Sequence, residues 1–145
     1  MTSWTPGWDA FPPALRDFWT ERHLCTLATV RADGRPHLVP VGVALDHEER
    51  CAWVITSGTS HKARRIASLT EAGDPAVGVP IAACQVEGRH WSTLEGHARV
   101  LTAPDAVRRA EHCYAERYRT PRPNPLRVAL RIEVDRFLLS RTLAG

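Results

Sequence analysis

Lysine is almost absent from this 145-residue chain, which carries its positive charge on arginine at every position except Lys62. The sequence also lacks any run of about five or more charges of one sign, and its net charge is only +3. No helix-turn-helix pattern, aromatic RNA-binding motif or basic stripe is present. A nucleic-acid partner is therefore not expected, whereas a mildly basic chain leaves room for a small anionic ligand.

Paired cysteines and long apolar segments are absent too. Because the four cysteines, Cys25, Cys51, Cys84 and Cys113, are far apart, we expect reduced and mostly buried thiols in place of a disulfide framework. The longest apolar run, AVGVPIAAC, is too short to cross a bilayer. The N-terminus lacks the basic and apolar regions of a signal peptide, so we expect a cytoplasmic protein with no membrane partner.

The spacing of apolar residues predicts an α+β fold. Strands are expected at 24–30, 36–46, 51–56, 76–86, 89–101 and 128–134, and helices after Pro12–Pro13, from about Ser60 to Leu69, and after Pro104. Most of these strands are joined by short turns, so the sheet should be antiparallel. Six such strands tend to close into a small barrel, because closure removes exposed edges. The length suggests a single domain over 1–145, with 1–11 as an N-terminal extension.

The strand at 36–46 has two unequal faces. Its odd positions, from His37 to Leu45, are expected to face the core, and its even positions Pro40, Gly42 and Ala44 form a face of small side chains. Proline donates no ladder hydrogen bond, and glycine permits close approach to the backbone. Such a face suits a flat ring system, although Pro40 is also typical of an unpaired edge strand.

The segment TSGTSHKARRI, residues 56–66, concentrates hydroxyl groups and cations where a strand gives way to a helix. A helix N-terminus presents free N–H groups and the positive end of its dipole, and it can hold an anion there. Lys62, Arg64 and Arg65 oppose that dipole unless a negative ligand is bound. This arrangement favours a phosphate site. A solvated helix start, capped by a hydroxyl, is the alternative.

Metal-binding and nucleophilic sites find little support. His90 and His97 fall on opposite faces of one expected strand, and no H-x-x-x-H or C-x-x-C pair converges on a metal. Adjacent His112 and Cys113 point apart on a helix, so they do not form a nucleophile–base pair. Glu95 is expected to pair with a nearby arginine.

The ordered set of these segments resembles the pyridoxamine 5'-phosphate oxidase-like split β-barrel family. RADGRPHLVPVG between two strands, then ITSGTSHKARRI, matches the family's phosphate-binding segment, and WSTLEGHARV matches a later strand. YRTPRPNPLRV is similar to the branch that uses the deazaflavin coenzyme F420, most of all to the F420-dependent biliverdin reductases. The resemblance spans residues 12–137. It implies a homodimer of split barrels with cofactor sites at the subunit interface.

The resemblance also assigns site residues. It implies that Thr56, Ser57, Ser60, Lys62 and Arg64 bind the cofactor phosphate, and that the backbone at Pro40 and Val41 lies beside the ring. Gln85 and Trp91 match positions near the cofactor. Arg65 departs from the family pattern, and it would suit the carboxylate-rich tail of F420 or a solvated position equally well. A compact lysine charge reaches into a small loop where the planar guanidinium of arginine fits less well.

The activity implied is hydride transfer from the reduced deazaflavin to a conjugated acceptor, with biliverdin reduced to bilirubin. No catalytic side chain is assigned, because the cofactor supplies the chemistry and the protein supplies binding and orientation. Arg119 and Arg122 are expected to bind the propionates of a tetrapyrrole. The alternative is a non-catalytic carrier or sensor of the same fold that binds flavin mononucleotide or haem.

Overall fold

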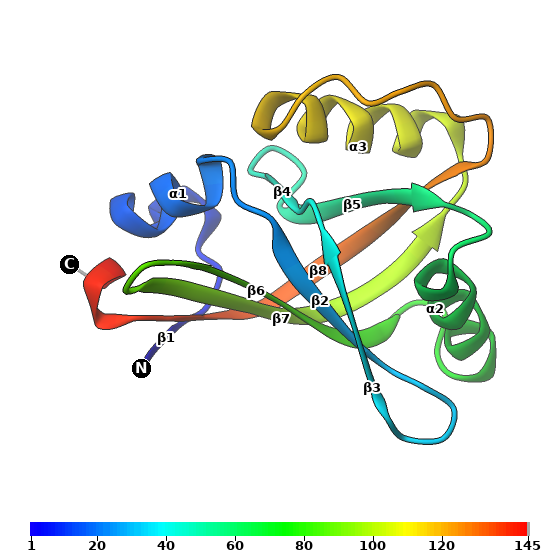
Figure 1. Cartoon of the computed structure of the whole chain (residues 1–145), viewed down its shortest axis with the longest axis horizontal. Helices are drawn as coiled ribbons and strands as arrows, with labels where there is room; N and C mark the ends of the chain where they lie inside the picture. Colours follow the sequence, from blue (N-terminus) through cyan, green and yellow to red (C-terminus); the bar gives the residue numbers. More distant parts are fainter. Residues whose placement is uncertain (145) are drawn as a thin grey trace.

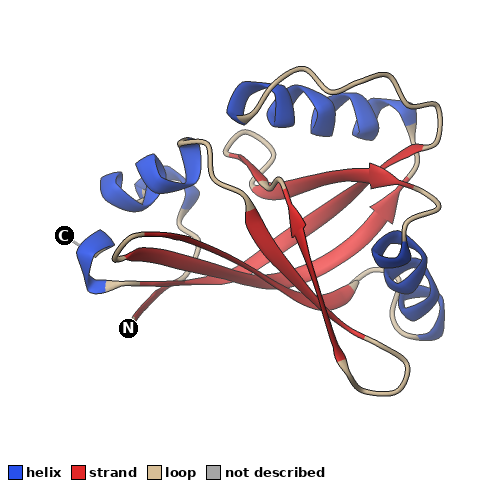
Figure 2. Ribbon diagram, viewed as in Figure 1, coloured by secondary structure: helices blue, strands red, loops and turns tan. Residues whose placement is uncertain are grey.

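Eight strands and three α-helices make up the part of the chain that the computed structural model describes, which is residues 1–144, with side chains for 1–70 and 73–144 (Figures 1 and 2). The strands are β1 (Thr2–Trp4), β2 (Cys25–Val30), β3 (Pro36–Val41), β4 (Ala44–Asp46), β5 (Cys51–Ser57), β6 (Val79–Glu87), β7 (His90–Leu101) and β8 (Arg127–Leu139). The helices are α1 (Pro13–Thr20), α2 (His61–Ala72) and α3 (Pro104–Arg117), with short 3-10 turns at Trp8–Ala10 and Arg141–Leu143.

All strand pairs are antiparallel, in the order β3-β2-β6-β7-β8-β5-β4, and β1 pairs with β8. The predicted α+β split barrel is therefore confirmed. The first residues, expected to be an extension, contribute a strand of this sheet, and β8 runs five residues past the predicted end at Val134. No helix among the described residues is long and apolar enough to cross a membrane.

The predicted strand at 36–46 is wrong in one respect, because the chain breaks at Gly42 and Val43 into β3 and β4. These two strands stand at opposite ends of the strand order, so the break carries the chain from one edge of the sheet to the other and closes the barrel (Figure 1). Val43 leaves the ladder because side chains bind its backbone. Its N–H donates to the Tyr118 hydroxyl (3.1 Å), and its carbonyl accepts from Arg117.

Two apolar clusters hold the fold together. The larger fills the barrel and is closed at one end by α1, whose Leu15, Phe18 and Trp19 are buried. The smaller lies between α3 and the outer side of β4, β5 and β8, and its buried members are Ala44, Cys51, Trp53, Ala110, Cys113 and Ala129. The prediction that Ala44 shares with Pro40 and Gly42 a small-residue face suited to a ring is therefore wrong, since α3 covers Ala44. All four cysteines are free thiols, and Cys84 alone among them is only half-buried.

Candidate cofactor-binding site

A pocket of about 330 Å³ opens where the end of β3, the end of β5, the start of α2 and the loop between α3 and β8 meet. In Figure 1, α2 begins below the tip of β5 and the loop after α3 passes above it. The lining residues are Pro40, Val41, Gly42, Ile55, Thr56, Ser57, Lys62, Tyr114, Arg119, Pro121, Arg122, Asn124 and Arg127. This volume lies within the range of small-molecule sites. Of these residues, four are cations and none is a carboxylate, so the pocket suits an anionic ligand.

Lys62 reaches the pocket because α2 begins directly beside the end of β5. Ser60 caps the helix, and its Oγ accepts a hydrogen bond from the backbone N–H of Ala63 (3.2 Å). Burial lowers the pKa of the Lys62 ammonium, and no carboxylate among the described residues offsets that burial. A desolvated cation without a counter-ion is stabilised when an anion binds beside it. Lys62 therefore has the environment of a ligand-binding cation.

The hydroxyl groups before α2 are held in a fixed arrangement. Ser57 Oγ and Thr59 Oγ1 are hydrogen-bonded (2.9 Å), and the backbone N–H of Thr59 donates to Ser57 Oγ (3.3 Å). The N–H of Gly58 donates to the carbonyl of Leu126 (2.8 Å), which ties this turn to the loop before β8. Thr56 and Ser57 line the pocket beside Lys62, as the sequence motif predicts.

Three other residues of the predicted phosphate-binding set do not line this pocket. Ser60 uses its hydroxyl to cap α2, and Arg64 is exposed on the surface of that helix. Arg65 points toward β2, where its Nε donates to the carbonyl of Val30 (3.0 Å). Helical geometry explains Arg64, which lies about 200° around α2 from Lys62. Arg65 lies nearer the face of Lys62, but its hydrogen bond to Val30 directs its side chain toward β2.

Gly42 permits a close approach to its backbone, as predicted, but the group that approaches is a tyrosine side chain of the protein and not a ligand. A Cβ built at Gly42 would lie 2.8 Å from Cε2 of Tyr114 and 3.0 Å from Cε2 of Tyr118. The two tyrosine rings pack against each other with centroids 4.9 Å apart. The small face of the strand thus receives Tyr114, and the part of it left for a ligand is the neighbourhood of Pro40 and Val41.

The loop between α3 and β8 brings the predicted arginines to the pocket. Arg119 and Arg122 both line it, and their side chains are exposed. Arg127 secures the far end of this loop: its guanidinium donates to Glu111 on α3 (2.7 Å) and to the carbonyl of Arg122 (2.6 Å). Asn124 accepts from the N–H of Leu126 through its side chain (2.9 Å). The loop is thus anchored while two of its cations stay available.

Gln85 and Trp91, both matched to cofactor positions, lie outside this pocket. Gln85 is 1% exposed, and its amide donates to the carbonyl of Phe18 (2.8 Å) and accepts from Arg117 (2.8 Å). Its polar atoms are thus satisfied within the core, and the structure does not bring Gln85 to this pocket. Trp91 is half-buried and pairs with Val86 across β6 and β7, on the outward face of the sheet.

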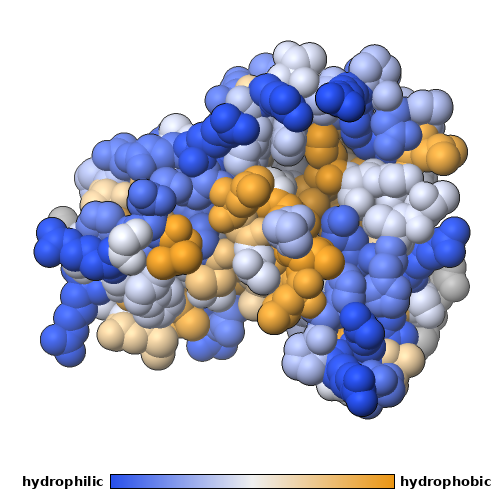
Figure 3. All heavy atoms as spheres, viewed as in Figure 1, coloured by the Kyte–Doolittle hydropathy of each residue, from blue (hydrophilic) through white to orange (hydrophobic). Residues whose placement is uncertain are grey.

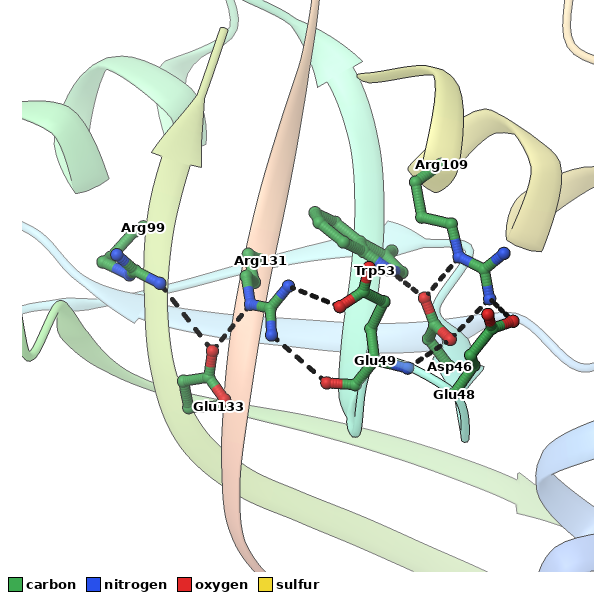
Figure 4. A network of polar contacts seen from close by, with 8 residues as sticks. All are labelled: Asp46, Glu48, Glu49, Trp53, Arg99, Arg109, Arg131 and Glu133. Atoms are coloured by element: carbon green, nitrogen blue, oxygen red, sulfur yellow. Dashed lines mark hydrogen bonds and ion pairs between the residues drawn. The ribbon is translucent and has the colours of Figure 1, made fainter. Parts of the chain in front are cut away.

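A network of charges fixes α3, and with it Tyr114, against the β4–β5 turn (Figure 4). Asp46 accepts two hydrogen bonds of 2.8 Å from Arg109 on α3 and one of 2.8 Å from Trp53 Nε1. Burial alone would raise the pKa of Asp46, but the Arg109, Glu49 and Trp53 hydrogen bonds outweigh it and hold that pKa well below its usual range. The ion pair belongs to the scaffold, since none of these residues lines the pocket.

Sequence reasoning missed five pocket residues: Ile55, Tyr114, Pro121, Asn124 and Arg127. Tyr114 falls at helical spacing with Val107 and Ala110, a pattern that does not indicate a ligand site, yet it lines the pocket. Pro121, Asn124 and Arg127 fall inside the YRTPRPNPLRV segment, so the segment was identified and these three members were not. The predicted pairing of Glu95 is confirmed, with Arg136 at 3.0 Å.

Comparison with known proteins adds a family and several relatives. The family model described as pyridoxamine 5'-phosphate oxidase matches residues 11–141. The chain is 45% identical over 126 residues to an F420H(2)-dependent biliverdin reductase of Mycobacterium tuberculosis (strain CDC 1551 / Oshkosh), covering 87% of this chain and 85% of the relative.

Solved structures share the fold at lower identity. A conserved hypothetical protein from Mycobacterium tuberculosis superimposes with a TM-score of 0.69 at 24% identity, over 94% of this chain and 89% of the other. A structure described as an F420 reductase gives a TM-score of 0.63 at 17% identity, over 85% and 94% of the two chains. At these identities the likeness concerns the fold alone.

Proposed function

Because the chain belongs to the pyridoxamine 5'-phosphate oxidase family, we propose that it is an oxidoreductase that uses coenzyme F420 to reduce a conjugated acceptor, biliverdin foremost. The observation that carries this proposal is the desolvated Lys62 ammonium, which lies beside Thr56 and Ser57 in a pocket lined by cations and free of carboxylates. The 45% identity to an F420H(2)-dependent biliverdin reductase supports the choice of cofactor and acceptor.

The residues present fit an F420-like cofactor. Lys62, Thr56 and Ser57 would hold its phosphate, since a cation and two hydroxyls complement the oxygens of a phosphate. Pro40 and Val41 would border its ring, where proline presents no N–H and an apolar surface. When bound, reduced F420 supplies the hydride, so the protein needs to orient the reactants and exclude water.

Arg119 and Arg122 would bind the acceptor. Both are exposed in the pocket wall opposite Lys62, on a loop stiffened by prolines and anchored by Arg127. A tetrapyrrole carries two propionates, and two guanidinium groups complement them with charge-assisted hydrogen bonds. This separates the roles of the cations: Lys62 serves the cofactor phosphate, and the loop arginines serve the acceptor carboxylates.

The proposed assembly is a homodimer that completes this pocket. Figure 3 shows a hydrophobic patch at the centre of the molecule. Leu38, Ala28 and Ala82 stand side by side on the outward faces of β3, β2 and β6, with Leu38 62% exposed. Pro40 lies on the same face and also lines the pocket, so the apolar face is continuous with the site. A second copy covering this face would bury it and add a wall to the pocket.

The test is a titration of the purified protein with F420 and, separately, with flavin mononucleotide, followed by cofactor fluorescence. We expect preferential binding of F420. Lys62→Ala should weaken it roughly 10- to 100-fold, because a hydrogen bond to a charged group contributes about 1.5–3 kcal/mol. Arg64→Ala removes an exposed cation two residues away and serves as the matched control, with an affinity close to wild type.

Biliverdin reduction with F420H2 is then assayed by the absorbance of bilirubin. Turnover that requires F420H2 supports the proposed reductase. Preference for flavin mononucleotide, or equal losses in Lys62→Ala and Arg64→Ala, would refute the assigned cofactor or the assigned role of Lys62. Binding of F420 without reduction of biliverdin would refute the proposed acceptor and leave the proposed cofactor standing.

A further inference from the structure

Arg117, the last residue of α3, is a buried cation that pairs with no acidic side chain among the residues described. It is 8% exposed, and no carboxylate among the described residues forms an ion pair with it. Burying an unpaired charge is costly, so such a residue persists only where other groups stabilise it. The pocket assignments above give Arg117 no role, since it does not line the proposed cofactor site.

Four oxygen atoms from three separate segments surround the guanidinium. Its Nε donates to the carbonyl of Glu21 (2.9 Å), and its Nη2 donates to the carbonyl of Phe18 (3.4 Å) and to Oε1 of Gln85 (2.8 Å). Its Nη1 donates to the carbonyl of Val43. Phe18 and Glu21 belong to the C-terminal end of α1, and Arg117 itself closes α3, so the cation lies at the negative ends of two helix dipoles.

The next residue extends the same junction. The Tyr118 hydroxyl donates to the carbonyl of His23 (2.6 Å) and accepts from the N–H of Val43 (3.1 Å). Arg117 and Tyr118 therefore bind both backbone groups of Val43, at the break that separates β3 from β4. The guanidinium carbon of Arg117 also lies 5.3 Å from the Tyr118 ring centre and 5.4 Å from that of Trp19.

This junction connects two segments that line the pocket, the end of β3 and the loop after α3. Gly42, beside Val43, belongs to the first, and Arg119, two residues after Arg117, belongs to the second. We propose that Arg117 is a positioning residue: its four hydrogen bonds set the separation between the end of β3 and the 119–127 loop, and so place Arg119 and Arg122 for the acceptor. The inference rests on the proposed function for the identity of the acceptor, and the geometry of the junction stands apart from it.

Two readouts test the inference, one of them independent of any ligand. Arg117→Met keeps a long side chain in the cavity and removes its donors, and Arg117→Lys restores the charge with a different geometry. Amide hydrogen exchange should accelerate in Arg117→Met at residues 119–126 and around Val43, and stay close to wild type in β7. Arg108→Met, which removes an exposed arginine from the same helix, is the matched control.

In the kinetic assay, the KM for biliverdin should rise about 10- to 100-fold in Arg117→Met, as expected when binding groups are displaced. The dissociation constant for F420 should rise by a clearly smaller factor than the KM, since Lys62, which would hold the phosphate, lies on α2 outside the junction, and only the ring side of the site borders the end of β3. Arg117→Lys should fall between Arg117→Met and wild type. If the dissociation constant for F420 rose by as much as the KM for biliverdin, Arg117 would support the fold as a whole, and the inference would be overturned.

A second variant keeps the inference testable if Arg117→Met fails to fold. Gln85→Leu removes one of the four acceptors and leaves three carbonyls in place. It should accelerate exchange in the same loop by a smaller factor and raise the KM for biliverdin. Unchanged exchange at 119–126 in a folded variant refutes the inference even if F420 binds. Accelerated exchange in a protein that neither binds F420 nor reduces biliverdin refutes the proposed function and leaves the junction established.

Discussion

Replacing Asp46 by asparagine isolates the contribution of one buried carboxylate to stability. The Asp46 side chain is fully buried, and it accepts two hydrogen bonds from Arg109, one from Trp53 and one from the N–H of Glu49, all between 2.8 and 3.0 Å. Asparagine keeps the shape but has one oxygen in place of two, and its NH₂ group would face a donor. Arg109 would then lose its buried partner, while keeping an exposed contact with Glu48 (Figure 4).

Breaking a buried ion pair costs about 3–5 kcal/mol. Because the Arg109 side chain is 30% exposed, water compensates part of the loss, and about 3 kcal/mol is expected. In a protein of this length, that corresponds to a fall in melting temperature of roughly 6–12 °C. Glu48→Gln is the matched control, since Glu48 is 82% exposed and contacts the same guanidinium, and its cost should stay below about 1 kcal/mol.

The pH dependence supplies an independent check. The folded-state pKa of Asp46 is depressed, so its stabilising contribution is complete above the ordinary aspartate pKa of about 4. It is lost as pH falls from there toward the depressed value, with a slope of at most about 1.4 kcal/mol per pH unit. In urea denaturation, the difference between wild type and Asp46→Asn should therefore shrink at acid pH. This account would be refuted if the unfolding free energies of wild type and Asp46→Asn differed by less than about 1 kcal/mol at neutral pH, or if their difference did not change with pH.

Three further results are expected. Gly42→Ala should destabilise the fold by about 1–3 kcal/mol in urea denaturation, because its Cβ would lie 2.8 Å from the Tyr114 ring, and it should alter the KM for the acceptor. Burial lowers the pKa of Lys62, so F420 affinity, measured by fluorescence against pH, should fall before the ordinary lysine pKa of about 10.4 is reached, whereas Lys62→Arg should remove that dependence. Leu38→Arg should reduce the mass seen by light scattering to that of one protomer, and Val77→Arg, at an exposed apolar residue outside the strands, should not.

The strands that sequence reasoning predicted well are those whose pattern is local. β5 and β7 alternate or run apolar over their whole length, and their predicted bounds agree with the structure to within one residue. Helix α2 was predicted from the same kind of signal, with its start placed near Ser60, the residue that caps it in the structure. Such features depend on residues that are close together in the sequence, so one sequence is enough to predict them.

The break at Gly42 and Val43 depends on partners far away in the sequence. Val43 is bound by Arg117 and Tyr118, which lie 74 and 75 residues later, and no local sequence pattern predicts that contact. An uninterrupted apolar alternation from 36 to 46 therefore predicts one strand where two are formed. Ala44 follows this break, and it lies in the cluster beneath α3 and not on the predicted face of small side chains.

The candidate site divides in a similar way. Lys62, Thr56 and Ser57 come from one short segment and were predicted together, and Arg119 and Arg122 come from another. Gln85 does not line this pocket, and a residue type at a matched position does not reveal where its amide points. In this chain the amide binds Phe18 and Arg117 inside the core.

The arginines around the pocket fall into two physical classes, and the division bears on how a ligand binds. Arg117 and Arg127 are held by acceptors of the protein and shape the walls. Arg119 and Arg122 stand exposed on the segment between them, with guanidinium groups that no described residue engages. A ligand that binds Arg119 and Arg122 does not have to break a protein hydrogen bond. Its binding therefore requires little reorganisation beyond ordering these two side chains. Were Arg117 or Arg127 the binding groups instead, each contact would first have to replace one that holds the wall, and affinity would fall accordingly.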